Sequence, residues 1–352
     1  MYNVKLYNKI SKVGLDDLDA AKYTCSEDFT DYDAVLVRSA KLHEVEFSKN
    51  LKCIARAGAG VNNIPIDRCS QEGIVVFNTP GANANAVKEL VICALLLASR
   101  KVVQGANWVK SLKGTPDIGP AAEKGKSTYA GPEIAGKKLG IIGLGAIGVK
   151  VANAAVALDM EVWGYDPFLS VDGALKLDRS VKHVTDLNEI FANCDYITIH
   201  VPLNADTKNT ISAEAIEKMK DGVRVINLAR GELVDTKAMA KALESGKVAA
   251  YVSDFASDEI LEQENAITLP HLGASTAEAE DNCASMAVME LRDFFENGNI
   301  INAVNFPKVD MGPLGDGHRL AFFVKDMENP VEEIMRMLSA AEIKVSKIQA
   351  GR

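Results

Sequence analysis

The hydrophobic positions of this chain form short apolar runs separated by segments with helical periodicity. Residues 84–99 and 275–297 carry apolar side chains at every third or fourth position, which predicts two long helices. The apolar runs have the length of buried strands: 4–7, 34–37, 53–56, 74–77, 139–142, 162–165, 196–201, 223–228, 248–252 and 266–269, with a shorter edge strand at 181–184. Alternating strands and helices predict the α/β class, with parallel sheets covered on both faces.

Shorter elements are expected between these runs. Asp186, Ser212 and Asp235 stand where helices would begin, since their side chains can accept hydrogen bonds from free backbone N–H groups. Residues 45–50 suit a short helix, and residues 102–113 a longer one.

Two segments stand apart from the alternation. Residues 114–136 are rich in Gly, Pro, Lys and Glu, which predicts a long surface loop. The long helix at 275–297 is expected to return to the first half of the chain, where residues 303–306 would add to the sheet.

The stretch from 137 to 166 carries the clearest chemistry. A strand runs into Gly143, Gly145 and Gly148 in G-x-G-x-x-G spacing, and a helix, a second strand and Asp166 follow. These glycines permit a tight turn, leave room for a pyrophosphate and let the helix pack on the strand. The helix N-terminus attracts phosphates, and the acid can bind the ribose hydroxyls. Glycines alone often only close turns, but this context predicts a dinucleotide site, and no Arg or Lys follows the acid, which favours NAD over NADP.

Composition narrows the class of protein. The 352 residues suggest two domains, and 47% hydrophobic and 25% charged residues are typical of a soluble globular protein. A net charge of −9 without a long basic run argues against a nucleic-acid or membrane partner. The N-terminus lacks a signal-peptide pattern, and six scattered cysteines without a C-x-x-C pair favour reduced thiols. We therefore expect a cytoplasmic protein without a bound metal.

Polar residues follow several predicted strands, at the edge where parallel sheets bind ligands. In the second half of the chain these are Arg230, Glu259 and His271. Taken singly, an arginine or an acid there is more often a solvated surface group, and a histidine a structural hydrogen-bonding group. Asp258 adjoins Glu259, so the register of the acid is open by one residue. In the first half the corresponding residues are Arg38, Ser39, Arg56 and Asn83.

With these residues in place, the chain resembles the D-2-hydroxyacid dehydrogenase family, and within it the phosphoglycerate dehydrogenases. The family's motifs follow in order over residues 1–306: RAGAGVNN (56–63), NTPGANANAVKELV (78–91), GIIGLGAIG (140–148), GYDP (164–167), HVPL (200–203), VRVINLARGELVD (223–235) and PHLGASTAEAE (270–280). The resemblance implies two Rossmann-like domains. A flavodoxin-like substrate domain would comprise 1–98 and 284–306, and an NAD-binding domain 99–283.

The resemblance also implies a role for each polar residue of the second half. Arg230 would hold the substrate carboxylate through two parallel N–H bonds. His271 would exchange the proton of the substrate hydroxyl, because an imidazole titrates near neutral pH. Glu259 would orient this histidine, and it is preferred to Asp258 because it follows Asp254 at the family's spacing.

Further contacts are implied by the same motifs. Besides the three glycines and Asp166, the expected cofactor-binding residues are Ala146, Ile147, Pro202, Thr207, Leu228, Ala229, Asp254, Gly273 and Ala274. The expected substrate-binding residues are Arg38, Ser39, Arg56 and Asn83, with the two arginines on a phosphate. Lys126 stands where the family often has a basic residue that reaches a neighbouring subunit's site.

The implied activity is NAD-dependent oxidation of 3-phosphoglycerate to 3-phosphohydroxypyruvate, the first step of L-serine biosynthesis, by a homodimer or a tetramer. A glyoxylate/hydroxypyruvate reductase or another D-2-hydroxyacid reductase is the nearest alternative. A non-catalytic NAD(H)-sensing binding protein is an alternative of another class. Residues 307–352 are expected to form a linker and a partial ACT-like module, with strands at 319–324 and 343–348 around a helix at 330–341.

Overall fold

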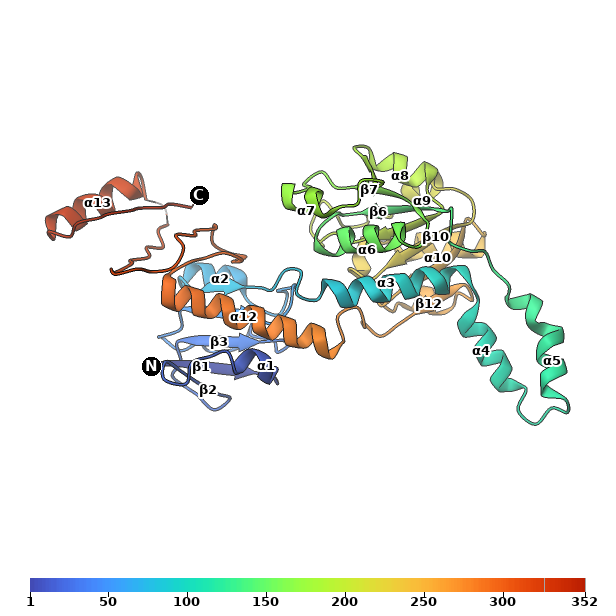
Figure 1. Cartoon of the computed structure of the whole chain (residues 1–352), viewed down its shortest axis with the longest axis horizontal. Coiled ribbons are helices and arrows are strands. Elements are labelled where there is room, and N and C mark those ends of the chain that lie inside the picture. Colours follow the sequence, from blue (N-terminus) through green and yellow to red (C-terminus); the bar gives the residue numbers. More distant parts are fainter. Residues whose placement is uncertain (326, 352) are drawn as a thin grey trace. The chain divides into compact units, whose positions relative to one another are not determined.

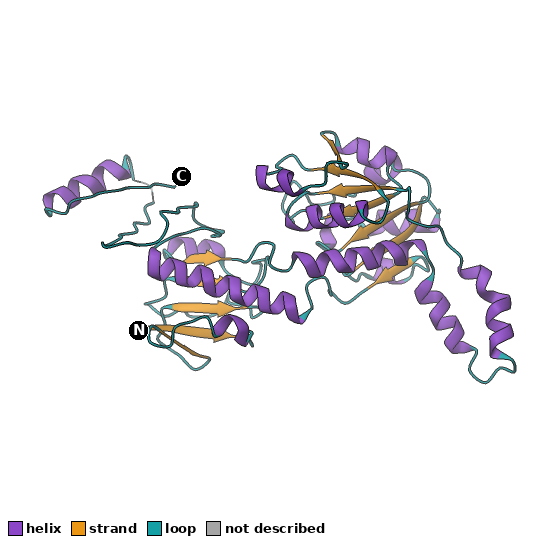
Figure 2. Cartoon of the chain, in the orientation of Figure 1, coloured by secondary structure: helices purple, strands orange, loops and turns teal. Residues whose placement is uncertain are grey.

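The computed structural model describes residues 1–325 and 327–351, which form two compact units (Figure 1). Unit 1 comprises Met1–Asn83 and Thr276–Arg352, and unit 2 comprises Ala84–Ser275. Each unit contains a parallel sheet with helices against it (Figure 2), so the predicted α/β class is confirmed. Both divisions lie earlier in the chain than the boundaries expected after residues 98 and 283.

Unit 1 is built on five parallel strands in the order β2-β1-β3-β4-β5, which is the order of flavodoxin-like sheets. Four of them coincide with predicted apolar runs, whereas the unpredicted β2 is an edge strand that buries only its first residue fully. The strands are β1 (Tyr2–Tyr7), β2 (Tyr23–Ser26), β3 (Ala34–Val37), β4 (Cys53–Arg56) and β5 (Val75–Phe77). Because Val37 is paired with Arg56, the residues that follow β3 and β4 lie at the same edge.

Helices cover both faces of this sheet. On one face lie α1 (Lys12–Leu15) and α12 (Ala277–Asn297), and on the other lies α2 (Ile66–Gln71). The long helix starts and ends as predicted: the Thr276 hydroxyl accepts a hydrogen bond from a first-turn N–H, and Gly298 is left-handed. The apolar face of α12 thus packs the C-terminal part of unit 1 against the sheet formed by its N-terminal part.

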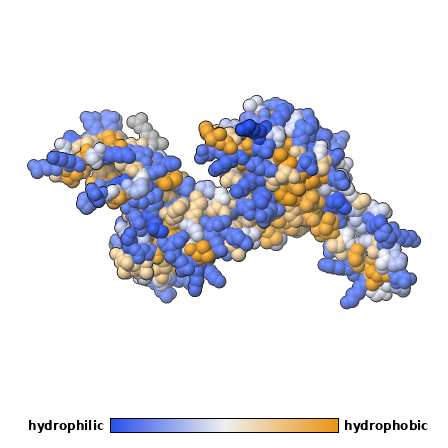
Figure 3. Space-filling model, viewed as in Figure 1, coloured by the Kyte–Doolittle hydropathy of each residue, from blue (hydrophilic) through white to orange (hydrophobic). Residues whose placement is uncertain are grey.

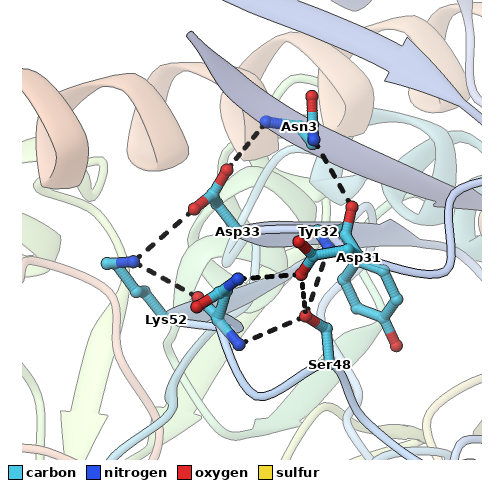
Figure 4. A network of polar contacts seen from close by, with 7 residues as sticks. Asn3, Asp31, Tyr32, Asp33, Ser48 and Lys52 are labelled. Carbon is cyan, nitrogen blue, oxygen red and sulfur yellow. Dashed lines mark hydrogen bonds and ion pairs between the residues drawn. The ribbon is translucent and has the colours of Figure 1, made fainter.

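The segment 45–50 is not the helix predicted for it. Ser48 Oγ accepts hydrogen bonds from the N–H groups of Tyr32 and Asn50 at 3.2 Å and donates to Asp31 Oδ1 at 2.9 Å. The Asn50 side chain donates to the same carboxylate oxygen at 2.8 Å. Figure 4 shows Ser48, Asp31 and Tyr32 of this network. Such side-chain bonds give the backbone an alternative to helical hydrogen bonds. The network lies ahead of β3 and β4, at the end of the sheet opposite the arginines.

The segment after α12 does not complete the sheet of unit 1 with a regular strand. Only an isolated antiparallel bridge joins Phe77 and Ala303, and the Val304 N–H donates to the Val76 carbonyl oxygen at 2.8 Å. The prediction of a strand over 303–306 was therefore wrong, although the segment does lie beside β5.

The expected ACT-like module is not confirmed, although the helix predicted over 330–341 is present. This is α13 (Pro330–Ala340), which buries none of its side chains. Residues 319–324 and 343–348 form no strand, so that part of the prediction was wrong. A strand needs a neighbour for its backbone N–H and C=O groups, and no described residue supplies one here.

Unit 2 contains seven parallel strands in the order β12-β11-β10-β9-β6-β7-β8. All of them coincide with predicted runs, and β8 lies at the edge as expected. The strands are β6 (Lys138–Ile142), β7 (Glu161–Tyr165), β8 (Lys182–Val184), β9 (Tyr196–Ile199), β10 (Val223–Asn227), β11 (Val248–Ser253) and β12 (Ala266–Thr268). The chain leaves β6 toward β7 on one side and later returns to β9 on the other, which creates the crevice where such sheets bind dinucleotides.

The helices of unit 2 lie on both faces of its sheet. One apolar cluster joins α3 (Ala84–Ser99) and α6 (Ala146–Val156) to the strands, and a second joins α8 (Leu187–Asn193), α9 (Ala213–Lys218) and α10 (Thr236–Glu244). The predicted caps are confirmed, since Asp186, Ser212 and Asp235 each accept a hydrogen bond from the N–H of a first-turn residue. Two short helices not predicted are α7 (Val171–Lys176) and α11 (Asp258–Leu261).

Residues 102–129 form a helical arm. The helix predicted over 102–113 is confirmed as α4 (Val102–Ser111), whereas the segment expected as a loop contains α5 (Ile118–Gly125) and the 3₁₀ helix η1 (Lys126–Tyr129). The rings of Trp108 and Tyr129 stack with their centroids 5.2 Å apart. This contact joins the first helix of the arm to η1. The arm buries no residue of its helices, and apolar side chains lie on its surface (Figure 3). No described helix is long and apolar enough to cross a membrane.

Candidate active site

The glycine turn between β6 and α6 has the geometry of a phosphate cradle. Gly143 has a φ of 96°, and a Cβ there would lie 2.6 Å from the carbonyl oxygen of His200. A Cβ at Gly148 would lie 1.9 Å from the carbonyl oxygen of Gly143, so helix and strand pack too closely for a side chain. A Cβ at Gly145 would meet no atom within 4 Å. The free space thus lies at the second glycine, beside the N-terminus of α6, where a pyrophosphate would be bound.

Asp166 follows β7 and faces this turn. Its Oδ2 accepts a hydrogen bond from the Leu144 N–H at 2.8 Å, and its Oδ1 accepts one from the Phe168 N–H at 2.8 Å. A carboxylate has about four acceptor positions, so both oxygens can still accept bonds from ribose hydroxyls. The carboxylate therefore supports the glycine turn and retains acceptor positions that could bind ribose hydroxyls.

The loop after β9 adjoins the same crevice. The Thr207 hydroxyl donates to the Pro202 carbonyl oxygen at 2.5 Å and accepts from the Asn204 N–H at 2.9 Å. These bonds close a compact turn that presents the two residues expected beside the adenine ribose.

Asp254, directly after β11, is a buried carboxylate with one free oxygen. Its Oδ2 accepts a hydrogen bond from the Gly273 N–H at 3.0 Å, while its Oδ1 has no partner among the described residues. Burial raises the pKa of this carboxyl, and the positive charges of His271 and Arg230 lower it in part. A buried acceptor without a partner is costly, so this oxygen is suited to an amide donor such as the nicotinamide carboxamide.

Arg230 follows β10 at a turn that the sequence did not explain. The side chain of Asn227, fully buried, donates to the Arg230 carbonyl oxygen at 2.8 Å and accepts from the Ala229 N–H at 3.2 Å. The guanidinium is half-buried and bonds the Ala229 carbonyl oxygen at 2.6 Å. A polar residue at the end of the apolar run VRVINL was the signal for this support.

His271 follows β12 in an unusual backbone conformation. Its φ is 37°, and its N–H lies within hydrogen-bonding distance of the carbonyl oxygens of Asp254 (3.0 Å) and Leu269 (3.2 Å). Its ring is exposed and packs against Phe255, with ring centroids 4.9 Å apart. Positive φ outside glycine is uncommon and clusters at functional sites. The packing aims an accessible imidazole at the edge that also carries Arg230.

Glu259 forms no hydrogen bond with this histidine among the described residues. It lies in the first turn of α11, half-buried, and its carbonyl oxygen accepts a hydrogen bond from the Gln263 side chain at 3.5 Å. The structure contains no hydrogen bond between the Glu259 carboxylate and the His271 ring, both of which it describes. The expected orienting bond therefore stays a prediction.

Sequence comparison places these motifs in a known family. Residues 92–274 match the profile of the D-isomer specific 2-hydroxyacid dehydrogenase, NAD binding domain. A D-3-phosphoglycerate dehydrogenase of Archaeoglobus fulgidus is 39% identical over 289 residues, which are 79% of this chain and 52% of that protein. A hydroxypyruvate reductase of Thermotoga maritima is 39% identical over 260 residues, which are 70% of this chain and 80% of that protein. The chain belongs to the D-isomer specific 2-hydroxyacid dehydrogenase family.

Structural comparison agrees with this assignment. The NAD⁺-bound 3-phosphoglycerate dehydrogenase of Entamoeba histolytica matches with a TM-score of 0.69 and 28% identity, covering 86% of this chain and 98% of that one. The predicted family and its NAD cofactor are thereby confirmed, and unit 2 carries the NAD-binding domain. The chain spans 49% to 66% of the length of four D-3-phosphoglycerate dehydrogenases that it matches.

In this family member, unit 1 gathers cations at the ends of β3 and β4. Arg56 Nε donates to the Arg38 carbonyl oxygen at 3.1 Å, and the Arg38 guanidinium pairs with Glu280 at 2.7 Å. The Ser39 N–H donates to the Asn8 side chain at 2.9 Å. The sequence did not point to Glu280, because its partner is distant in the chain.

The fourth residue expected on the substrate side, Asn83, is the last residue of the first part of unit 1. It is half-buried and directly precedes α3, the helix that opens unit 2.

Proposed function

We propose that this protein is an NAD-dependent D-3-phosphoglycerate dehydrogenase, which oxidises 3-phosphoglycerate to 3-phosphohydroxypyruvate in the first step of L-serine biosynthesis. The observation that carries the proposal is the pair Arg38 and Arg56 at adjoining strand ends of unit 1. A phosphate dianion is bound best by guanidinium groups and hydroxyl or amide donors, and Ser39 lies beside them. The similarity to D-3-phosphoglycerate dehydrogenases supports the same substrate.

The residues proposed to act in the reaction itself belong to unit 2. Arg230 holds the carboxylate, and His271 accepts the proton of the C2 hydroxyl during oxidation and returns it during reduction. Bound NAD supplies the hydride acceptor. A positioned acid or base of this kind contributes about 10²- to 10⁴-fold to the rate. Glu259 orients the imidazole in the substrate complex, since catalytic hydrogen bonds often tighten only when the ligand is bound.

The residues around the cofactor fit NAD. The open space at Gly145 admits the pyrophosphate, Asp166 binds the adenosine ribose, and the free Oδ1 of Asp254 accepts a bond from the carboxamide. A carboxylate at the ribose repels a 2′-phosphate, which makes NAD the preferred form.

A hydroxypyruvate reductase is the second candidate, because the relative from Thermotoga maritima with this name is 39% identical and the match spans 80% of it. The two candidates differ in one chemical demand: only the first has to bind a phosphate. Arg38 and Arg56 favour the first.

An NADH-consumption assay decides between them. Purified protein is given phosphohydroxypyruvate, hydroxypyruvate, glyoxylate or 2-oxoglutarate, and the highest kcat/KM is expected for phosphohydroxypyruvate. Arg38→Gln should raise KM for this substrate about 10-fold or more, since a charge-assisted bond to phosphate is worth about 1.5–3 kcal/mol. Arg68→Gln, which changes a partly exposed arginine of the same unit that pairs with Glu72, is the matched control. Strong turnover of glyoxylate or hydroxypyruvate without turnover of phosphohydroxypyruvate would assign the second function.

We further propose that the protein is a cytoplasmic homodimer. The surface of the α4–α5 arm supports an interface, with Val102, Val109 and Ile118 each about half exposed at 55%, 46% and 45%. On a dimer, Lys126 of η1 would reach the neighbouring subunit's site. Light scattering after size exclusion tests the assembly, and a monomeric mass at micromolar concentration would contradict it.

A further inference from the structure

Arg38, one of the two arginines proposed to bind phosphate, forms an ion pair with Glu280. Arg38 Nη2 lies 2.7 Å from Glu280 Oε1, and the two side chains are 39% and 44% exposed. Arg38 follows β3, and Glu280 lies in the first turn of α12, so the contact joins residues from the two ends of the chain within unit 1. Nothing in the reaction itself requires an acid at this place.

Glu280, Arg38 and Arg56 all contribute charge at the Cys283 thiol. One turn further along α12, burial raises the pKa of the Cys283 thiol, while the charges of Arg56 and Arg38 lower it and that of Glu280 raises it. All three charges therefore act on one buried atom. A phosphate bound by the two guanidinium groups would come to lie near the carboxylate.

The carboxylate has two opposite effects on a bound phosphate. As a hydrogen-bond acceptor it holds the Arg38 side chain in one position, which lowers the entropy lost on binding. As an anion it repels the phosphate and partly neutralises the guanidinium. The positioning effect is small, because a half-exposed ion pair contributes little. Repulsion of a dianion is larger, since it involves twice the charge of a single ion pair.

We propose that Glu280 is a specificity-determining residue: its negative charge beside Arg38 weakens binding of the phosphorylated substrate relative to the unphosphorylated one. This inference rests on the proposed function. The acid narrows the difference in binding affinity between phosphohydroxypyruvate and hydroxypyruvate. It does not contact the reacting atoms.

Glu280→Gln tests the proposal, because glutamine keeps an oxygen that can accept the Arg38 bond and removes only the charge. KM for phosphohydroxypyruvate is expected to fall about 3- to 10-fold, as follows from a partly screened charge at the surface. The kcat and the KM for hydroxypyruvate should stay as in the unmodified protein. The fall should shrink as NaCl is raised, because salt screens exposed charges.

Glu278→Gln is the matched control. Glu278 lies in the same turn of α12, is exposed, and forms no ion pair with a described residue. The Glu278→Gln substitution removes the same charge from a residue that does not pair with Arg38, so its effect on KM should be smaller. If both variants change KM equally, the net charge of the helix and not the ion pair sets the affinity, and the proposal is overturned.

Two further outcomes separate this inference from the proposed function. An unchanged or raised KM for phosphohydroxypyruvate in Glu280→Gln overturns the inference while the function stands. If the unmodified protein does not turn over phosphohydroxypyruvate, the function fails, and inorganic phosphate becomes the probe. The inhibition constant of inorganic phosphate, measured against whichever oxoacid the protein reduces, should then fall about 3- to 10-fold in Glu280→Gln, because the same partly screened charge is removed. An unchanged inhibition constant overturns the inference.

Discussion

Gly145→Ala should weaken cofactor binding with little loss of folding stability. A Cβ at Gly145 meets no atom within 4 Å, and the residue has a φ of −73° and a ψ of −162°, which alanine can adopt. It is the N-cap of α6, where alanine is less favourable than glycine. The free energy of unfolding should therefore fall by only about 0.5–1 kcal/mol.

Binding of NADH should suffer far more than folding. The added methyl group occupies the space through which a pyrophosphate approaches the backbone N–H groups at the start of α6. Loss of one hydrogen bond to a charged group costs about 1.5–3 kcal/mol. At 1.4 kcal/mol for each factor of ten, the Kd for NADH should rise about 10- to 150-fold.

Gly148→Ala is the matched comparison, because its methyl group would lie 1.9 Å from the carbonyl oxygen of Gly143. Helix and strand would have to separate, at a cost of about 1–3 kcal/mol. In a unit of this size the Tm should fall about 2–12 °C. Calorimetric NADH titration and thermal unfolding without cofactor measure both quantities. Binding of NADH to Gly145→Ala with an unchanged Kd would refute the placement of the pyrophosphate at this glycine. Equal losses of Tm in the two variants would refute the conclusion that a side chain fits at Gly145 without a clash.

Three further variants test the remaining groups. His271→Asn keeps a residue tolerant of positive φ and removes the imidazole ring, so kcat should fall about 10²- to 10⁴-fold with NADH affinity near unchanged; full turnover would exclude the acid–base role. Asp166→Asn keeps an acceptor for the Leu144 N–H and removes the charge, so the preference for NAD over NADP should shrink about 3- to 30-fold, and an unchanged ratio of kcat/KM would assign it to another group. Burial raises the pKa of Glu290 from 4.5 to about 8. The folded protein then holds a proton that the unfolded chain has lost, so stability is fully present below about pH 4.5 and is lost as pH rises through about 8. Glu290→Gln keeps an acceptor for Asn302 and should match the Tm of the unmodified protein near pH 4 but exceed it near pH 9; parallel profiles in calorimetry would contradict this.

Local patterns were sufficient for most of the fold. Buried parallel strands are apolar along their whole length, so each run in unit 2 could be found without knowledge of its neighbours. Helix starts such as Asp235 depend on bonds within one turn. The glycine turn and Asp166 belong to one βαβ unit, and its chemistry could therefore be predicted from spacing.

Elements that depend on distant residues were the ones predicted wrongly. The segment 45–50 has a helical pattern, but bonds to Asp31 replace its backbone bonds. The segment expected as a loop contains α5 and η1, and Tyr129 of η1 stacks on Trp108 of α4, a contact that composition does not reveal. The tail segments have strand-like sequences, but no strand of the described residues pairs with them.

The sequence by itself therefore determined the α/β class, the order of most strands along the chain, the dinucleotide motif and the identities of the polar residues at strand ends. Tertiary structure alone decided which of those residues meet. Desolvation lowers the pKa of His200 to about 4, whereas His271 is held accessible at positive φ. The pairing of Arg38 with Glu280 arises because α12 returns to the first sheet. Spacing encodes contacts within a turn or a βαβ unit, but contacts across the chain follow from sheet order and packing.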